Sequence, residues 1–381
     1  MFVPWGMVTL RTMASASASP HTADHRTIGG ARTHARHPDG QPTAIGTAIT
    51  GWGRQLPARV VTNHELSASL DTSDEWIQSR TGIRERRIAS GEESTASLAT
   101  GAARAALAVA NLDPADVDLV IVCTFTPDAG NMPTVASNVQ HALGATRAGA
   151  FDLNAACAGF VYGLGVANAL VASGIHRNVL LIGAETLSRV LDWNDRSTCV
   201  LFGDGAGAVI VQRSDAPHAF SALRSLVTGA DGSRGNALII PAGGSSAPAS
   251  HDTVDARAHY IQMDGREVYR FAVSTVPDTC LQAIHDAGLE PHDIDVVILH
   301  QANIRILRSV VETLGIPWDR AVINLDRYGN TSAASIPIAL SEAVDDGRVS
   351  PGDRILVAGF GGGLTWGAAV INWRGVPDAT D

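Results

Sequence analysis

The sequence contains two copies of one pattern, and this internal repeat restricts the fold more than any other feature. The stretches DPADVDLVIVCTFTP and EPHDIDVVILHQAN each place a proline-containing turn and an acidic pair before a short apolar run. The first run, Asp118–Cys123, follows a predicted helix over Thr95–Asn111, and the second, Asp295–Leu299, follows one over Glu267–Ala287. Apolar runs that alternate with alanine-rich helical stretches are typical of α/β folds. We therefore predict two α/β halves built on the same unit.

The later part of each half continues the comparison. Ala150–Leu153 leads into a predicted helix near Cys157, and Ala321–Leu325 leads towards one over about Thr331–Val344. A polar segment rich in Gly and Ser, from Gly229 to Arg257, is interpreted as a loop that crosses a surface.

These patterns divide the chain into an N-terminal half, residues 44–216, and a C-terminal half, residues 217–376. Residues 1–43 are rich in Ala, Ser, Thr, His and Arg and lack periodicity, which indicates a flexible extension.

Charge and composition exclude several classes of function. The formal charge is 28 minus 38, or −10, and every basic residue is Arg, so we expect no nucleic-acid partner. Without lysine there is no P-loop lysine and no lysine-linked pyridoxal phosphate. The four cysteines show no metal-ligand or disulfide spacing, and no apolar stretch approaches the ~18 residues of a membrane span. We predict a cytoplasmic protein that binds neither metal nor membrane.

Cys157 is the first candidate for chemistry. It lies in NAACAGF, where an apolar strand ends and a helix of small residues begins. Amides at a helix N-terminus favour a thiolate and lower the pKa of the thiol, as a nucleophile requires. The alternative is a buried, inert cysteine, which is the interpretation we favour for Cys123, Cys199 and Cys280.

His300 and Asn330 lie at comparable corners of the C-terminal half. His300 ends the run VVIL, and Asn330 follows Gly in RYGNTSAAS. A structural histidine and a turn-forming asparagine are the alternatives. However, a Cys and a His with an Asn that holds an oxygen suit thioester or acyl chemistry.

Two glycine clusters do not fit a dinucleotide-binding motif. FGDGAGA runs into a strand over Val209–Gln212, and GFGGGLTWG has Leu364 where the last glycine belongs. We expect instead that these glycines let neighbouring backbone segments approach closely. The amides of Gly361, Gly362 and Gly363 could then hold an oxyanion.

From residue 44 onwards the chain resembles the β-ketoacyl-acyl carrier protein synthase III family of the thiolase superfamily. The motifs are SDEWIQSRTGIRERRIA, NAACAGF, FGDGAGA, HQANIR, GNTSAAS and GFGGGLTWG. The resemblance implies a thiolase-like fold, in which duplicated βαβαβαββ halves form five layers αβαβα, and a homodimer. It further implies that Cys157 is acylated by an acyl-CoA starter. Malonyl-acyl carrier protein then loses CO2 and attacks the acyl-enzyme, while His300 and Asn330 bind its thioester carbonyl.

The product implied is a 3-oxoacyl-acyl carrier protein, formed without any cofactor beyond the CoA thioester substrates. The amide of Cys157, with one from the glycine cluster, would bind the other oxyanion. The family pattern assigns CoA or substrate contacts to Trp76, Arg80, Arg196, Gly265, Asn303 and Met132. It assigns carrier-protein contacts to Gln301, Ala302, Arg305 and Arg308, of which the two arginines are spaced i, i+3 on one helix.

Met132 lies about 25 positions before Cys157, where the family has a residue that reaches the acyl pocket of the partner. A flexible methionine there predicts starters somewhat longer than acetyl, with an ordinary core residue as the alternative. An ester-forming acyltransferase of secondary metabolism would lose or repurpose the decarboxylation pair, but both His300 and Asn330 are present. A degradative thiolase would carry a second cysteine where this chain has GFGGGLTWG, and a non-enzymatic homologue would have lost Cys157. A synthase III-like acyltransferase or starter enzyme of a secondary-metabolite (polyketide) pathway stays as the alternative function, because the sequence does not identify the pathway.

Overall fold

Two mixed β-sheets form the centre of the structure, a computed structural model that describes residues 45–130, 132–214 and 222–375. The predicted extension, residues 1–43, lies outside the described residues, as does the predicted boundary between residues 216 and 217. The first sheet has the order β1 (Gly46–Gln55), β7 (Gly205–Ser214), β6 (Asn178–Glu185), β4 (Leu119–Cys123) and β5 (Gly149–Leu153). The second has the order β11 (Val296–Leu299), β12 (Arg354–Gly361), β13 (Thr365–Asn372) and β8 (Leu223–Ala230).

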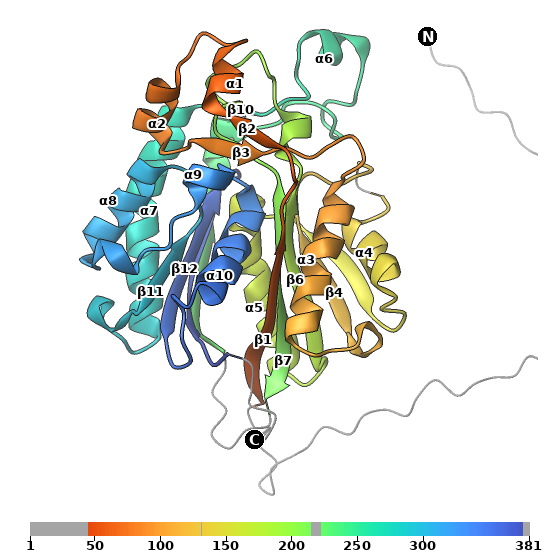
Figure 1. Ribbon diagram of the computed structural model, residues 1–381, viewed down its shortest axis with the longest axis vertical. Coiled ribbons are helices and arrows are strands. Elements are labelled where there is room, and N and C mark those ends of the chain that lie inside the picture. Colours follow the sequence, from red (N-terminus) through yellow and green to blue (C-terminus); the bar gives the residue numbers. More distant parts are fainter. Residues whose placement is uncertain (1–44, 131, 215–221, 376–381) are drawn as a thin grey trace, which may run out of the picture. The chain divides into compact units, whose positions relative to one another are not determined.

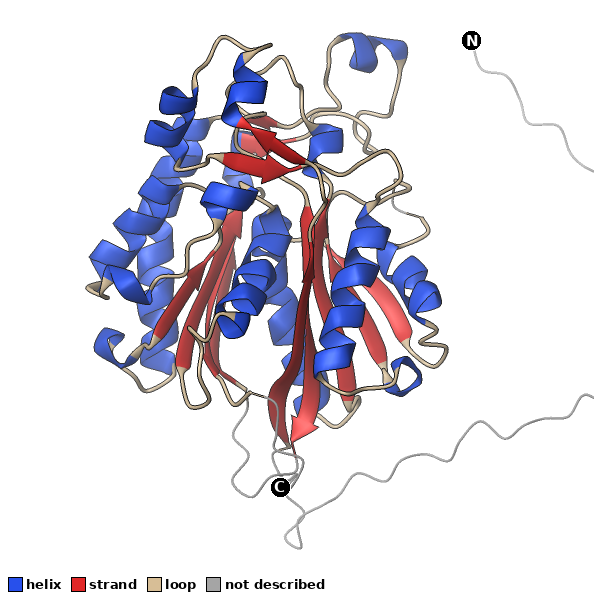
Figure 2. Ribbon diagram, in the orientation of Figure 1, coloured by secondary structure: helices blue, strands red, loops and turns tan. Residues whose placement is uncertain are grey.

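Helices cover both faces of each sheet, so that five layers alternate (Figures 1 and 2). One outer layer holds α3 (Thr95–Val109) and α4 (Val135–Leu143), and the other holds α7 (Gly265–Asp286) and α8 (Ile304–Leu314). Between the sheets lie α5 (Gly159–Ala172) and α10 (Ser335–Asp345), which contact strands of both. The order of layers is the αβαβα arrangement that the sequence implied.

Both halves follow the same path. In each sheet two neighbouring strands run parallel, and two antiparallel strands complete the other side: β4 and β6 match β11 and β12, while β7 and β1 match β13 and β8. In the first sheet β5 adds a further parallel strand beside β4. The duplication read from the two repeated stretches is therefore present in the strand order and directions.

Residues Ala321–Leu325 form no strand equivalent to β5 of the first sheet. Only Ala321 pairs with the sheet, in one isolated parallel bridge to Val297, before the chain turns into α9 (Leu325–Tyr328). The Gln301 side chain explains the break. It donates to the Val322 carbonyl at 3.1 Å and accepts from the Asn324 amide at 3.0 Å, so it satisfies backbone groups that a ladder would otherwise pair.

Small residues let the central layer approach the first sheet. A Cβ at Gly183 of β6 would lie 2.3 Å from the Ala333 carbonyl oxygen, and one at Gly207 of β7 would lie 2.6 Å from the Ile338 nitrogen. Both contacts are with the segment that forms the 3₁₀ turn η7 (Ser332–Ala334) and the start of α10. Glycine at these two strand positions therefore allows the segment to pack directly against the backbone of the first sheet.

Smaller elements lie at one end of the strands (Figure 1). Strand β2 (Val60–Thr62) pairs with β3 (Glu85–Arg87), and between them in the chain lie α1 (Asn63–Ser67) and α2 (Asp74–Thr81). The predicted surface loop Gly229–Arg257 contains β9 (Leu238–Ile239), which pairs with β10 (Gln262–Met263), and the helix α6 (His251–Asp255). The remaining short 3₁₀ turns are η1 (Pro114–Asp116), η2 (Ala156–Ala158), η3 (Leu187–Val190), η4 (Gly232–Ala237), η5 (Pro291–Asp293) and η6 (Trp318–Arg320).

Candidate active site

The three candidate residues Cys157, His300 and Asn330 line one small cavity of about 130 Å³, which we call the inner cavity. Cys157 comes from η2, directly before α5, and His300 directly follows β11. Asn330 lies between α9 and η7. All three are buried, with exposed fractions of 4%, 1% and 7%. The fold thus brings together residues from both halves of the chain.

Burial decides the protonation state of Cys157 and corrects the prediction made for its pKa. We expected amides at the helix N-terminus to lower the pKa, but loss of solvent raises the pKa of the Cys157 thiol to about 12. The Ser332 side chain and the amides of Cys157 and Gly362 favour the thiolate without outweighing burial. The resting nucleophile is therefore a thiol.

His300 is held in a neutral form. Burial lowers the pKa of its imidazole to about 3, and its ring packs edge-on against Phe360 at 5.2 Å between centroids. Its Nδ1 lies 2.7 Å from the Ser335 hydroxyl oxygen, which also accepts the Gln301 amide at 3.3 Å. Because Nδ1 is engaged, Nε2 is the ring nitrogen left for the inner cavity.

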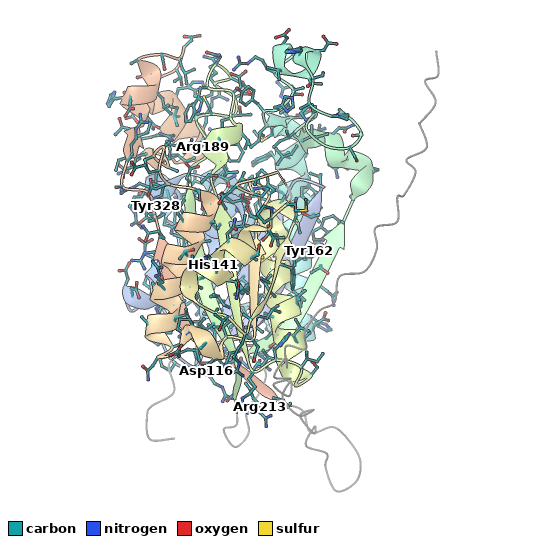
Figure 3. All side chains as sticks on the ribbon, turned by 90° about the vertical axis from the view of Figure 1, so that its right-hand side faces the viewer. Asp116, His141, Tyr162, Arg189, Arg213 and Tyr328 are labelled. Atoms are coloured by element: carbon teal, nitrogen blue, oxygen red, sulfur yellow. The ribbon has the colours of Figure 1, made fainter. Side chains whose placement is uncertain are left out.

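Asn330 is oriented by its own backbone neighbours. Its Oδ1 accepts the Ser332 amide at 2.8 Å, which leaves the NH₂ group of the side chain for the cavity. Its backbone pairs with Phe202 in an isolated bridge. The preceding helix is anchored because the Tyr328 hydroxyl (labelled in Figure 3) donates to the buried Glu342 carboxylate at 2.9 Å. The amide group is therefore placed by a rigid turn.

Two further hollows adjoin the inner cavity. An apolar cavity of about 430 Å³ shares Cys157 with it, and its other walls include Phe125, Phe202, Leu238, Ile239, Ile240 and Ile261. An open groove of about 710 Å³, the arginine groove, shares Gly265, Tyr269 and Asn303 with the inner cavity. It is further lined by Arg80, Arg266, Arg270 and Arg305. The thiol thus lies between an apolar compartment and a polar approach.

Three of the residues assigned to CoA, namely Trp76, Arg80 and Arg196, lie together, and Arg80 also lines the arginine groove. The guanidinium groups of Arg80 and Arg196 lie over the Trp76 ring, at 5.1 and 5.4 Å from its centroid. The Asn303 side chain donates to the Arg80 carbonyl at 3.1 Å, which ties the start of α8 to the end of α2. A flat aromatic ring flanked by two cations suits a nucleotide with phosphates.

Of the predicted glycine amides, that of Gly362 acts on the Cys157 sulfur, while Gly361 lines the inner cavity and Gly363 the apolar one. Met132 is 86% exposed and lines none of the cavities found in the described chain. The chain by itself therefore does not bring Met132 to the candidate site.

One predicted carrier-protein contact is wrong. Gln301 is 1% exposed and its side chain is engaged with backbone groups, so it cannot present its amide to a partner. Ala302 lines the inner cavity instead of an outer surface. Arg305 and Arg308 are exposed on α8, where Arg305 donates to the Ser79 carbonyl and Arg308 stacks on Trp318.

Sequence reasoning missed two buried groups next to the site, Ser335 and Glu185. Glu185 ends β6, is fully buried, and accepts hydrogen bonds from Thr124 and Thr126. Burial raises its pKa to about 7. An acidic residue at the end of an apolar strand, in LLIGAE, was the available signal.

Within the described residues, no cluster of His, Cys, Asp or Glu side chains is arranged to hold a metal ion. No helix among them is long and apolar enough to cross a membrane.

Two family models match separate segments of the chain. Residues 151–232 match the family model described as 3-oxoacyl-[acyl-carrier-protein] synthase III, and residues 284–373 match the model of its C-terminal part. A β-ketoacyl-[acyl-carrier-protein] synthase III from Roseiflexus sp. (strain RS-1) is 51% identical, over 86% of this chain and 98% of the relative.

Solved structures agree with this comparison. The 3-oxoacyl-[acyl-carrier-protein] synthase III from Aquifex aeolicus has a TM-score of 0.78 and 46% identity, over 86% of this chain and 100% of that one. A priming β-ketosynthase of a polyketide biosynthetic pathway has a TM-score of 0.80 and 37% identity, over 88% and 98%. With the sheets and layers described above, these structures confirm the predicted thiolase-like fold.

Proposed function

Because the chain belongs to the 3-oxoacyl-[acyl-carrier-protein] synthase III family, we propose that it starts fatty acid synthesis by condensing an acyl-CoA with malonyl-acyl carrier protein. In the first half-reaction the Cys157 sulfur bonds to the acyl carbon and the bond from that carbon to the CoA sulfur breaks. The thiol proton leaves with CoA. In the second, the bond between the malonyl carbon and its carboxylate breaks, and the released electron pair forms a bond to the acyl carbon of the acyl-enzyme. The bond from that carbon to the Cys157 sulfur then breaks, and the sulfur takes up a proton from solvent. CO2, 3-oxoacyl-acyl carrier protein and the free thiol result.

The observation that carries this proposal is the position of Cys157 between two unlike compartments. The apolar cavity on one side suits the acyl chain of an acyl-enzyme. The inner cavity on the other side holds the polar groups of His300 and Asn330. A thioester that enters along the arginine groove would meet both the thiol and these groups.

His300 and Asn330 would supply hydrogen bonds to the thioester oxygen as decarboxylation builds negative charge on it. The Ser335 oxygen accepts the Gln301 amide, so its own proton is free to go to Nδ1 of His300. That arrangement keeps the proton of the neutral imidazole on Nε2, the nitrogen left for the cavity. The Oδ1 atom of Asn330 accepts the Ser332 amide, so the NH₂ group at the other end of the side-chain amide is free to donate. Two neutral donors would thus face the developing oxyanion.

The arginine groove is proposed to receive CoA first and the carrier protein later. Trp76, Arg80 and Arg196 would hold the nucleotide, with Gly265 and Asn303 beside the pantetheine chain. Arg305 and Arg308 would meet an acidic carrier protein, whose prosthetic group follows the same path.

A homodimer is proposed on the exposed edge of the first sheet. β5 is the outermost strand of that sheet, and its Phe151 is 36% exposed. A second copy of β5 alongside would cover this edge and extend the sheet. Met132 would then be available to reach the apolar cavity of the partner subunit.

Acylation followed by mass spectrometry tests the function. Incubation with acetyl- or butyryl-CoA should add one acyl group to the intact protein, and malonyl-acyl carrier protein should then remove it as 3-oxoacyl product. Cys157→Ser should fold but gain no acyl group, because a hydroxyl is harder to ionise and a weaker nucleophile than a thiol in the same position. Acylation of the Cys157→Ser protein would refute the assignment of Cys157 as the nucleophile. Comparing the condensation rates with malonyl-loaded carrier proteins from a fatty acid pathway and from a polyketide pathway decides between a housekeeping and a specialised role.

A further inference from the structure

The apolar cavity shares one lining residue with another hollow. This neighbouring hollow, which we call the side cavity, has a volume of about 510 Å³. Among the described residues, Phe125 alone lines both the apolar cavity and the side cavity. It follows β4 by two positions and is half-buried. Phe125 therefore lies where the two cavities meet.

The backbone around Phe125 is fixed on both sides by one buried carboxylate. Glu185 accepts the Phe125 amide at 3.3 Å, the Thr126 amide at 3.2 Å and the Thr124 hydroxyl at 3.1 Å, and the Thr126 hydroxyl also donates to it. Thr95 further bonds the Thr126 carbonyl at 2.6 Å. None of these bonds involves the ring of Phe125. The ring can accordingly be exchanged while the segment that carries it stays in place.

The side cavity has room for carbon chain and ends among polar groups. Its walls include the apolar residues Val190, Pro127 and Ala242 as well as the charged residues Glu93, Asp128 and Arg189. Arg189, labelled in Figure 3, also donates to the Ser90 and Glu93 carbonyls. An aliphatic chain that passed the ring would find a second compartment of similar volume to the first.

We propose that Phe125 is a specificity-determining residue whose ring sets the longest acyl chain that Cys157 accepts, by closing the apolar cavity against the side cavity. This inference rests on the proposed function, since it concerns the starter of the same reaction. With phenylalanine the enzyme takes acyl groups that fit the apolar cavity alone. With a small residue the two cavities become one channel, and medium-length acyl groups enter.

The test is the chain-length profile of Cys157 acylation. Second-order acylation rates are measured by intact-protein mass spectrometry for acetyl-, butyryl-, hexanoyl-, octanoyl- and decanoyl-CoA, each normalised to acetyl-CoA. Phe125→Ala should raise the normalised rates for octanoyl- and decanoyl-CoA by about tenfold or more, because each buried methylene alters discrimination by roughly that factor. Phe125→Leu, which keeps a smaller apolar group, should give an intermediate profile and serves if the alanine variant is unstable.

Ile240→Ala is the matched control, since Ile240 lines the apolar cavity but not the side cavity. Enlarging the apolar cavity without opening it should shift the optimum by only one or two carbons. An unaltered profile in both Phe125 variants, or an equal gain in Ile240→Ala, would overturn the assignment of Phe125. Failure of every acyl-CoA to acylate the wild-type protein would instead overturn the proposed function.

Discussion

Gly361→Ala should disable the nucleophile through a single methyl group. A Cβ at Gly361 would lie 2.8 Å from both Cβ and Sγ of Cys157 and 3.2 Å from its nitrogen. These separations are shorter than van der Waals contact, so η2 or the end of β12 must move. Overpacking of this kind typically costs about 1–3 kcal/mol of folding free energy. A displacement approaching 1 Å at a reacting atom lowers rates by about 10²-fold. We therefore expect acylation of Cys157 to slow by one to two orders of magnitude.

Gly362→Ala provides the matched comparison one residue along the chain. There the nearest atoms to an added Cβ are the Leu238 carbonyl oxygen at 3.3 Å and the Ala156 Cβ at 3.6 Å, so little has to move. Acylation is measured by stopped incubation with acetyl-CoA and intact mass, and folding by urea denaturation. Gly362→Ala should acylate at nearly the wild-type rate. If Gly361→Ala did the same while remaining folded, the close packing of β12 against the nucleophile would have no role in its reactivity.

Three further perturbations address the groups around the thiol. His300→Ala and Asn330→Ala should each slow decarboxylation of malonyl-acyl carrier protein by ~10²- to 10³-fold, as loss of one oxyanion donor does. Each should slow Cys157 acylation far less. Comparing the rate of radiolabelled CO2 release with the rate of acylation checks this. Ser335→Ala should shift the proton of His300 from Nε2 towards Nδ1, seen in imidazole ¹⁵N shifts, and lower decarboxylation, whereas Ser335→Thr should restore both. The raised pKa of Glu185, about 7 against an ordinary 4.5, means that the folded protein holds this proton more tightly than the unfolded chain does. Stability should therefore fall as pH rises between these values. The wild type should lose roughly 3 kcal/mol of unfolding free energy relative to Glu185→Gln between about pH 4 and pH 8. If urea titrations gave the same difference in unfolding free energy between the two proteins at every pH, the prediction would be wrong.

The sequence pointed to Cys157 and His300 because each lies shortly after an apolar run, whereas Asn330 was distinguished only by its turn after Gly329. A reactive side chain directly after a strand can be recognised in the sequence and is found at the same place in the structure. His300, which follows the strand VVIL, is an example. What the sequence lacked was burial. The pKa of Cys157 depends on how much solvent the surrounding layers exclude, and that is a property of the packed tertiary structure.

Two other errors have the same origin. The family pattern assigns Gln301 to the carrier protein, yet its side chain turns inward and bonds to backbone groups around Val322. The Gly- and Ser-rich insertion was read as a surface loop, but its apolar residues Leu238, Ile239 and Ile240 form a wall of the apolar cavity. Neither result follows from local propensity, since both depend on partners far away in the chain.

The repeat also explains where the nucleophile and the amide come from. In the first half, Asn154 Oδ1 accepts the Ala156 amide at 3.1 Å, and Ala156 has a left-handed φ of 46°. In the second half, Asn330 Oδ1 accepts the Ser332 amide at 2.8 Å, and Ser332 has a φ of 50°. Each turn precedes a helix of the central layer, so the two are equivalent structures. Cys157 follows the left-handed residue of the first turn, while Asn330 opens the second.

Under the proposed function, one turn of the duplicated unit would therefore supply the nucleophile, and its counterpart would supply an oxyanion donor. Left-handed backbone in residues other than glycine is strained, and it persists where surrounding contacts hold it. Here η2 and η7 pack against each other across the central layer, so each turn helps to hold the other. The second turn lacks a thiol, since the residue after Ser332 is Ala333, whereas His300 and Asn330 both come from the second half, so neither half holds all three candidate residues. The site consequently forms only when the two halves pack together, and the two equivalent turns have taken different chemical roles within it.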